Sequence, residues 1–468
     1  MSATRPAAPP TATFDGPAHV LVNDLHSRLN PTRVRRVVRP RSAVELPGIV
    51  AAAREEGLPI CVAGGWHAMG GQQFASDATL LDLRGMNRIL GLDRERGIVD
   101  VEAGVQWPQL VAYDARPWGI AQKQTGADRL TLGGALAANI HGRGLRMRPF
   151  VGDIESFTLI DEGGNAVECS RTQNAERFAL AVGGYGLFGV VASLRLRLSR
   201  RQKLQRVVEV QRIDSLMSAF RKRIEDGFLY GDFQFAIDEA SDNFLTEGVF
   251  SCYRPVAEET PLPAQAELRP EEWIGLLALA HDDKRAAYER YRDYYLSTDG
   301  QIYWSDEHQL SFYPDGYHAR IAPEPGSEII SELYVPRERL ADFLLAAREL
   351  LRRDPPGVVY GTVRLIERDD ETFLAWARQP WACIIFNLHT PHTPEGQMRS
   401  ANAFRGLIDL AIERSGSYFL TYHRYARRDQ IDACHPRFAE FLRQKRAFDP
   451  AERFQSDWYR FYKAMYRS

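Results

Sequence analysis

A glycine-rich loop around a single histidine, at residues 62–72, is the part of this chain best suited to bind a ligand. It follows an apolar run at residues 58–62 with the composition of a β-strand, so the pattern predicts a strand that ends in a tight turn. Glycine permits positive φ and close backbone approach, so several backbone N–H groups can converge on an anion such as a pyrophosphate. His67 lies in the middle of this turn, within reach of whatever the loop holds.

Two further glycine-rich segments follow, at residues 125–144 and 183–198. In the first, Thr131 is a suitable N-cap for a short helix of small and apolar residues at 132–139. The second begins as a turn and continues into alternating apolar and polar residues, which predicts a strand with one buried face. Three such loops within about 130 residues can line one elongated cofactor.

The chain lacks the signature of a nicotinamide-dinucleotide fold. That signature is a strand, a G-x-G-x-x-G turn and a helix, with an acidic residue about twenty positions further on. The near-match at residues 183–189 follows a predicted helix and precedes a strand, which is the reverse order. A nicotinamide domain is therefore not expected.

Taken in order along the chain, these segments resemble the FAD-binding module of the vanillyl-alcohol oxidase family, also called the p-cresol methylhydroxylase type. The resemblance includes an opening strand and helix at residues 37–46, a strand at 81–83 and a closing segment at 436–457. It implies an α+β fold, in which a two-part FAD-binding module carries a substrate (cap) domain with an antiparallel sheet covered by helices. FAD is the implied cofactor.

The resemblance places residues of all three glycine-rich segments against the FAD. They are Val62, Gly64, Gly65, Trp66, His67, Ala68, Gly71, Gln72, Gly126, Thr131, Gly133, Gly134, Ala137, Asn139, His141, Gly142, Gly184, Gly186, Gly189 and Val190. His141 stands at the end of the predicted small-residue helix, where it either contacts the flavin or the substrate or caps the helix ahead of Gly142.

His67 has a more specific expectation. The spacing Gly-x-x-His-x-x-x-Gly-Gln is similar to the loop of cytokinin dehydrogenases and alditol oxidases, in which the histidine is bonded to the flavin 8α-methyl group. The resemblance therefore implies covalent FAD through His67, although Ala68 replaces the usual serine. The alternative is a histidine that only hydrogen-bonds a phosphate or fills the turn. A second, cysteine link is not expected, because no cysteine lies between Cys61 and Cys169.

Oxidation of an alcohol carbon needs a hydride acceptor and a group that takes the hydroxyl proton. In decaprenylphosphoryl-ribose oxidases, which this chain resembles, a lysine lies on the last strand. The matching run at residues 419–423 has no lysine, and the replacements are Tyr422 and His423. Since side chains alternate along a strand, only one of the two can face the flavin.

Aldonolactone and alditol oxidases instead present a glutamate and an arginine from the sheet of the substrate domain. Arg364 and Glu367, at the end of a predicted strand at 358–366, can fill these roles, and Glu332 is a third candidate. The choice among these catalytic candidates stays open.

Composition and the spacing of apolar runs divide the chain into four expected parts. Residues 1–18 are rich in Pro, Ala and Thr, which predicts a disordered tail. We expect the FAD-binding module at residues 19–204, the substrate domain at 205–415, and a segment that returns to the module at 416–468. In the substrate domain we expect strands at 229–237, 329–335, 358–366 and 382–388, helices at 338–352 and 394–414, and an exposed connection at 255–270. One more strand is expected at 418–422.

The composition of the chain argues against several classes of protein. With 26% charged residues and a net charge of −2 among 468 residues, the chain shows no electrostatic footprint for nucleic acid. No apolar stretch approaches the roughly 20 residues of a transmembrane helix. Five scattered cysteines predict free thiols and a cytoplasmic location. The polar runs 306–308 and 389–392 lack a recognised ligand spacing, so no metal is expected.

These observations predict an enzyme that oxidises a CH–OH group of a carbohydrate-like alcohol (a polyol, sugar, lactone or nucleoside) by hydride transfer to flavin N5. Molecular oxygen or another acceptor would reoxidise the flavin, and a homo-oligomer is possible. The alternative is a flavoenzyme of the same fold that acts on C=C or C–N bonds, similar to sterol reductases or cytokinin dehydrogenases.

Overall fold

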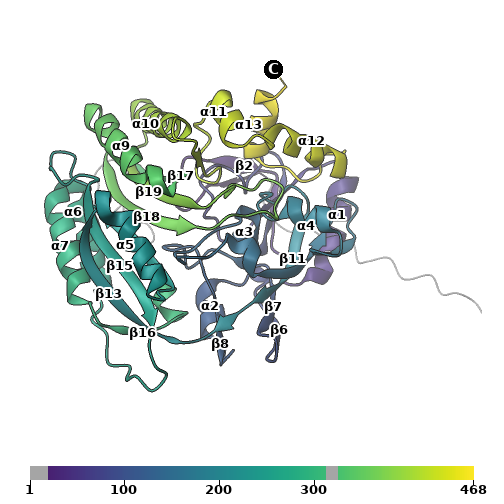
Figure 1. Cartoon of the computed structure of the whole chain (residues 1–468). Helices are drawn as coiled ribbons and strands as arrows, with labels where there is room; N and C mark the ends of the chain where they lie inside the picture. Colours follow the sequence, from purple (N-terminus) through teal and green to yellow (C-terminus); the bar gives the residue numbers. More distant parts are fainter. Residues whose placement is uncertain (1–18, 312–324, 468) are drawn as a thin grey trace, which may run out of the picture.

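The computed structural model describes residues 19–311 and 325–467, and Figure 1 shows how its elements are arranged. The expected N-terminal tail at residues 1–18 lies outside the described residues. The N-terminal strands form two sheets that sit beside a larger one. A parallel sheet has the order β3 (Arg36–Val38), β5 (Thr79–Asp82), β4 (Ile60–Ala63).

An antiparallel sheet follows the parallel one along the chain. Its order is β10 (Ala166–Ser170), β9 (Ile154–Ile160), β11 (Val190–Arg197), β7 (Ile98–Glu102), β6 (Ile89–Asp93). Strand β11 buries every second residue, as its alternating sequence predicts. The short pairs β1 (Val20–Val22) with β2 (Thr32–Val34) and β8 (Trp118–Gly119) with β12 (Ser199–Arg200) flank these sheets. Helices α1 (Leu46–Glu55), α2 (Trp107–Ala112), α3 (Leu132–Ala138) and α4 (Ala175–Ala181) complete this region.

The predicted short helix is confirmed as α3, and local chemistry sets both of its ends. The Thr131 side chain accepts a hydrogen bond from the Gly134 N–H, so Thr131 is the N-cap. The helix ends at Asn139, which adopts a left-handed conformation with φ 47°. Asn139 therefore takes the capping position that we considered for His141, and that interpretation of His141 was wrong.

An antiparallel sheet of eight strands dominates the rest of the molecule, which confirms the expected antiparallel sheet. Its order is β16 (Ile302–Trp304), β13 (Lys203–Arg212), β15 (Glu247–Pro255), β14 (Tyr230–Phe235), β18 (Val358–Ile366), β19 (Trp381–Pro391), β17 (Gly326–Pro336), β20 (Ser417–Tyr418). The predicted last strand is wrong in length, because pairing stops at Tyr418 and the chain turns at residues 420–422.

The two faces of this large sheet differ in chemistry. One face carries Leu333, Val363 and Ile384 and packs with α5 (Ile213–Glu225), α9 (Leu340–Arg353) and α10 (Pro394–Ile412) into the main hydrophobic core. The opposite face carries polar residues. At its β13–β15 end this second face is covered by α6 (Pro270–Asp282) and α7 (Lys284–Ser297), seen at the left of Figure 1. Because side chains alternate along a strand, the residues that pack against α9 and α10 cannot face the other side.

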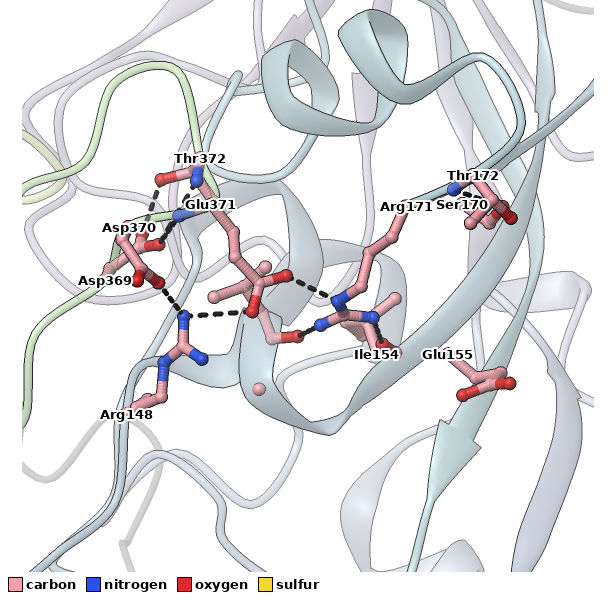
Figure 2. Close-up of polar contacts among 12 residues, drawn as sticks. Arg148, Ile154, Glu155, Ser170, Arg171, Thr172, Asp369, Asp370, Glu371 and Thr372 are labelled. Carbon is pink, nitrogen blue, oxygen red and sulfur yellow. Dashed lines mark hydrogen bonds and ion pairs between the residues drawn. The ribbon is translucent and has the colours of Figure 1, made fainter.

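The loop between β18 and β19, residues 367–380, ties the large sheet to the N-terminal region. Figure 2 shows Glu371 between Arg148 and Arg171, with nitrogen–oxygen distances of 2.9 and 2.6 Å, and Asp370 paired with Arg148. Nearby, the Asn139 amide donates to Asp369 at 3.0 Å. These contacts hold the loop against the segment that follows α3.

The C-terminal segment packs on the first sheets through α11 (Arg428–Cys434), α12 (Phe438–Phe448) and α13 (Asp457–Met465). Phe454 forms a parallel bridge with Ile60, and the Asp457 N–H donates to the Phe74 carbonyl at 2.7 Å. None of the described helices is long and apolar enough to cross a membrane. The five cysteines are all free thiols, as expected.

Candidate active site

A cavity of about 690 Å³ lies between the glycine-rich loops and the polar face of the large sheet. Many of the residues expected to contact FAD line it: Val62, Gly64, Gly65, Trp66, His67, Ala68, Gln72, Gly126, Thr131, Gly133, Gly134, Ala137, Gly186 and Gly189. The structure thus brings all three glycine-rich segments to one cavity, although 38 to 110 residues lie between them along the chain. Gly71, Asn139, His141, Gly142, Gly184 and Val190 do not line it.

The shape of the first loop fits a bound cofactor. Trp66 has φ 63°, a conformation that non-glycine residues adopt rarely and that tends to cluster at functional sites. A Cβ atom on Gly64 would lie 2.0 Å from the Thr131 hydroxyl, so the first and second loops touch closely. Trp66 and His67 both line the cavity, and the buried Trp66 Nε1 has no hydrogen-bond partner among the described residues. Buried polar atoms are normally satisfied, so this N–H suits a polar ligand such as FAD.

His67 is paired with a residue that sequence reasoning missed. Its Nδ1 lies 2.5 Å from Nε2 of His26, and the two ring centroids are 4.7 Å apart. Burial, followed by the neighbouring His26, lowers the pKa of His67 to about 3, so its imidazole is neutral at physiological pH. A neutral imidazole keeps one ring nitrogen with a free electron pair, which covalent attachment requires, and one N–H, which can donate a hydrogen bond to a ligand oxygen.

The glycines of the second and third loops serve two different purposes. A Cβ on Gly134 would meet only the Thr131 and Leu130 side chains, at 3.1 and 3.3 Å, and the residue borders the cavity. A Cβ on Gly184 would lie 2.1 Å from the Leu180 carbonyl oxygen, away from the cavity wall. Gly184 is therefore required by the packing of the polypeptide, whereas Gly134 leaves room for a ligand.

Glu332 is the centre of a buried hydrogen-bond network on the polar face of the large sheet. Its carboxylate accepts bonds from the Tyr422 phenol at 2.8 Å, His141 Nε2 at 2.8 Å and the Tyr334 phenol at 3.0 Å. Burial alone would raise the pKa of Glu332, but His141, Tyr422 and Arg364 lower it to about 2. Glu332 is therefore ionised, and Tyr422 is the member of this network that lines the cavity.

His141 completes the network from the N-terminal side. Its Nε2 faces the Glu332 carboxylate, and its Nδ1 faces the Gly142 carbonyl oxygen at 3.0 Å. Because both partners are acceptors, both contacts are hydrogen bonds only when the ring carries two protons. His141 and Glu332 then form a buried ion pair, with relative side-chain exposures of 1% and 0%.

Arg364 lies on β18 next to this network and lines the cavity. Its side chain is buried, and Nε and Nη1 have no hydrogen-bond partner within the described parts of the chain. The nearby Tyr360, Asp232 and Glu332 outweigh burial and raise its pKa, so Arg364 is a fixed cation. Its unpaired N–H groups can donate to an oxygen of a ligand beside Tyr422.

The other two catalytic candidates lie elsewhere. His423 does not line the cavity; its Nε2 is 3.1 Å from the Ser331 hydroxyl and its ring stacks on Phe404. Burial lowers its pKa to about 3. Glu367 forms an ion pair with Arg337 at 2.9 Å and is also absent from the cavity wall. Of the five candidates, the structure groups Tyr422, Glu332 and Arg364.

Several residues that complete the site carry no signal in the sequence. The Gln124 amide donates to the Tyr422 phenol at 3.2 Å, and Tyr360 and Asn387 line the cavity from β18 and β19. Glutamine, asparagine and tyrosine on loops and strands are common, and only their position in the fold marks these three.

Within residues 19–311 and 325–467, two groups of side chains could hold a metal ion. They are His141, Glu332 and Cys383 inside the network just described, and His281, Glu328 and His389, whose ligand atoms lie within 4.8 Å of one another. The second group includes His389 from the run at residues 389–392. Asp306, from the other polar run, pairs with Arg201 at 2.8 Å instead. The expectation of no metal stays a prediction.

Comparison with known proteins agrees with this geometry. A protein-family model described as an FAD binding domain matches residues 34–170 of this chain. The L-gulonolactone oxidase of Bos taurus is 30% identical over 172 residues, which is 36% of this chain and 38% of that protein. The chain thus spans little more than a third of the mammalian relatives, with 36% of the Mus musculus L-gulonolactone oxidase covered.

Two other relatives extend the comparison. The L-gulono-1,4-lactone dehydrogenase of Mycobacterium tuberculosis is 23% identical over 429 residues, or 91% of this chain and 95% of that protein. The mitochondrial L-galactono-1,4-lactone dehydrogenase of Arabidopsis thaliana is 28% identical over 209 residues, which is 43% of this chain and 34% of that protein. Residues 34–170 of this chain therefore match an FAD binding domain, and the chain is similar to proteins named L-gulonolactone oxidase, L-gulono-1,4-lactone dehydrogenase and L-galactono-1,4-lactone dehydrogenase.

Proposed function

We propose that this protein is an FAD-dependent oxidoreductase that oxidises a CH–OH group of a carbohydrate-like alcohol, with sugar lactones as the first class to test. Residues 19–204 form the two-part FAD module, residues 205–415 the substrate domain, and 416–468 the segment that returns to the module. When bound, FAD supplies the hydride acceptor for such a reaction. Dioxygen or another acceptor reoxidises it.

The observation that carries the proposal is the Tyr422–Glu332 pair at the wall of the FAD-type cavity. The Tyr422 phenol donates its proton to ionised Glu332 at 2.8 Å, which leaves the phenol oxygen ready to accept a hydrogen bond from a substrate hydroxyl. As the substrate loses hydride, the hydroxyl proton passes to Tyr422 while the Tyr422 proton passes to Glu332. Tyr422 is thus the direct proton acceptor, and Glu332, which is ionised at rest, is the next group in the proton relay.

Arg364 and His141 have supporting roles in this scheme. Arg364 places unpaired N–H groups beside Tyr422, where they hold a second oxygen of the substrate. His141 pairs with Glu332 from the side away from the cavity and fixes the direction of the carboxylate. The Glu332 network is buried, so the side chains of Tyr422, His141 and Tyr334, which donate to Glu332, are positioned before the substrate binds.

The comparisons favour an alcohol donor over the alternative. The relatives reported above are named for lactones of sugar acids, and none of them is named for a C=C or C–N bond. We further propose that His67 carries the FAD covalently. Its neutral ring, its position in the cavity wall and the spacing of its loop support this link.

The proposal is tested by anaerobic mixing of the flavin-loaded protein with L-gulono-1,4-lactone, L-galactono-1,4-lactone, polyols, nucleosides and amines. We expect the yellow flavin absorbance to bleach with at least one alcohol donor and not with the amines. Bleaching by amines alone would contradict the proposal in favour of C–N chemistry. Readmission of air then separates rapid reoxidation by dioxygen from dependence on another acceptor.

A further inference from the structure

The cavity does not end at Tyr422 and Arg364 but continues beneath the helix pair α6 and α7. This second part, which we call the aromatic chamber, is lined by Arg206, Trp273, Leu276, Tyr291, Tyr295 and Tyr303. These residues come from β13, α6, α7 and β16, at the end of the large sheet that α6 and α7 cover (Figure 1). One continuous cavity therefore joins the proposed oxidation site to a chamber of different character.

The walls of the chamber are mainly aromatic rings in contact with one another. Tyr291 and Tyr295 have centroids 4.3 Å apart, and Trp273 meets Tyr294 edge-on at 5.8 Å. A sugar lactone offers aromatic side chains only the small C–H face of a single ring, so it covers little of this wall. Flat rings pack on such walls by offset stacking or edge-to-face contact, which favours an aromatic ligand over a flexible aliphatic chain.

Arg206 lies at the floor of this chamber with only 8% of its surface exposed. Its Nε donates to the Tyr253 phenol at 2.9 Å, and its Nη1 donates to the Thr298 hydroxyl at 2.8 Å. The guanidinium also lies over the rings of Tyr253, Tyr295 and Tyr303, at 5.2, 5.1 and 4.7 Å from their centroids. Burial raises the pKa of Tyr295 to about 12 and also raises the pKa of Tyr303, so neither phenol supplies a negative charge to Arg206.

Two other buried cations of the cavity wall region, Lys123 and Arg143, are paired with carboxylates. Lys123 pairs with Asp128 at 2.6 Å, and Arg143 pairs with Asp232 at 3.6 Å. For Arg206 no salt bridge to a carboxylate exists within residues 19–311 and 325–467. A buried charge is costly unless it is paired, so a cation at the floor of a cavity favours an anionic ligand group.

We propose that the aromatic chamber binds an aromatic ring that bears an anionic group, with the ring between the tyrosines and Trp273 and the anion on Arg206. This inference rests on the proposed function, because the ring belongs to the same substrate whose hydroxyl group lies at Tyr422. The substrate class is then an acidic aromatic glycoside or ester of a sugar, larger than a simple aldonolactone.

Three probes separate the ring from the charge. They are 4-carboxyphenyl, 4-carbamoylphenyl and methyl β-D-glucopyranoside, and their binding to the flavin-loaded protein is measured by titration calorimetry without turnover. We expect the carboxyphenyl probe to bind about 10- to 100-fold more tightly than the carbamoylphenyl probe, as for a hydrogen bond to a charged group. The methyl glycoside, which lacks the ring, is expected to bind about tenfold more weakly than either aryl probe.

Variants test the assignment of each part. Arg206→Met should abolish the preference for carboxyphenyl over carbamoylphenyl, and Arg206→Lys should retain it. Arg254→Met is the matched control, because Arg254 is exposed on the neighbouring strand β15 and its guanidinium donates to Gln205. Leu276→Trp fills the chamber and should weaken both aryl probes without affecting the methyl glycoside.

The outcomes distinguish this inference from the function on which it rests. Equal binding of the three glycosides by the wild-type protein, or a charge preference that survives Arg206→Met, overturns the inference even if lactones are oxidised. If Arg206→Met does not fold, the wild-type preferences and Leu276→Trp decide. A chamber that binds the acidic aryl probe through Arg206 in a protein that oxidises no alcohol would instead leave the inference standing and refute the proposed function.

Discussion

Replacement of Tyr422 by phenylalanine is the most direct test of the proposed proton path. The change removes one oxygen atom and keeps the ring, which packs edge-on against Phe419 at 5.7 Å. The lost atom makes the 2.8 Å bond to Glu332 and accepts the 3.2 Å bond from Gln124. Among the described residues that donate to Glu332, Tyr422 is the one that lines the cavity, and Tyr422→Phe removes its hydroxyl while the ring stays in the wall.

The magnitude follows from the chemistry of these contacts. Loss of a positioned group that accepts the hydroxyl proton slows the chemical step by about 10²- to 10⁴-fold. Glu332 keeps its bonds from His141 and Tyr334, so its charge stays paired and the free energy of unfolding should fall by only about 1–3 kcal/mol. The FAD content should be unchanged, since Tyr422 is on the side of the cavity formed by the C-terminal segment.

The assay is rapid anaerobic mixing with the best alcohol donor and measurement of the rate of flavin reduction. His423→Gln is the matched control, because His423 is the next residue and its side chain bonds Ser331 outside the cavity. We expect Tyr422→Phe and Glu332→Gln to reduce the flavin slowly, and His423→Gln and Glu367→Gln to stay within a few-fold of the wild type. Near wild-type rates in both Tyr422→Phe and Glu332→Gln, with correct flavin content, would refute the proposed proton path.

Three further predictions concern the cofactor and stability. Acid precipitation should leave the flavin on the wild-type polypeptide and release it from His67→Ala; quantitative release from the wild type would contradict the covalent link. Gly134→Val should yield folded protein with little FAD, because the new side chain enters the cavity. Gly184→Val should instead lower the melting temperature, because the new side chain collides with the Leu180 carbonyl. Full flavin occupancy in Gly134→Val would show that this loop does not contact FAD. His423 has a pKa of about 3 in the fold against an ordinary value of 6.5, so its contribution to stability is complete above pH 6.5 and is lost as the pH falls towards 3. Urea titrations at several pH values should show that His423 lowers the free energy of unfolding by about 1.4 kcal/mol for each pH unit below 6.5, and this dependence should be absent in His423→Phe. The same pH dependence in His423→Phe would contradict this assignment.

Local patterns in the sequence were sufficient for many elements of the fold. The strand predicted at residues 358–366 is β18 (Val358–Ile366), and the N-cap predicted at Thr131 starts α3. Such features depend on neighbouring residues, through side-chain alternation and capping bonds, so they can be read without the fold. The shortened last strand shows what local patterns cannot predict. The end of β20 is set by its pairing with β17 and not by local propensity.

The sequence by itself also determined the type of cofactor, because the three glycine-rich segments are local signatures that together resemble an FAD module. It could not choose among Tyr422, His423, Glu332 and Glu367, since all are polar residues on or near predicted strands. Only the tertiary structure decided which of them meet, because the pairing of β17 with β20 brings Glu332 beside Tyr422 and the turn after α3 brings His141 to Glu332. The distances between residues 141, 332 and 422 depend on sheet register and on packing between distant segments, and no local pattern encodes either of these.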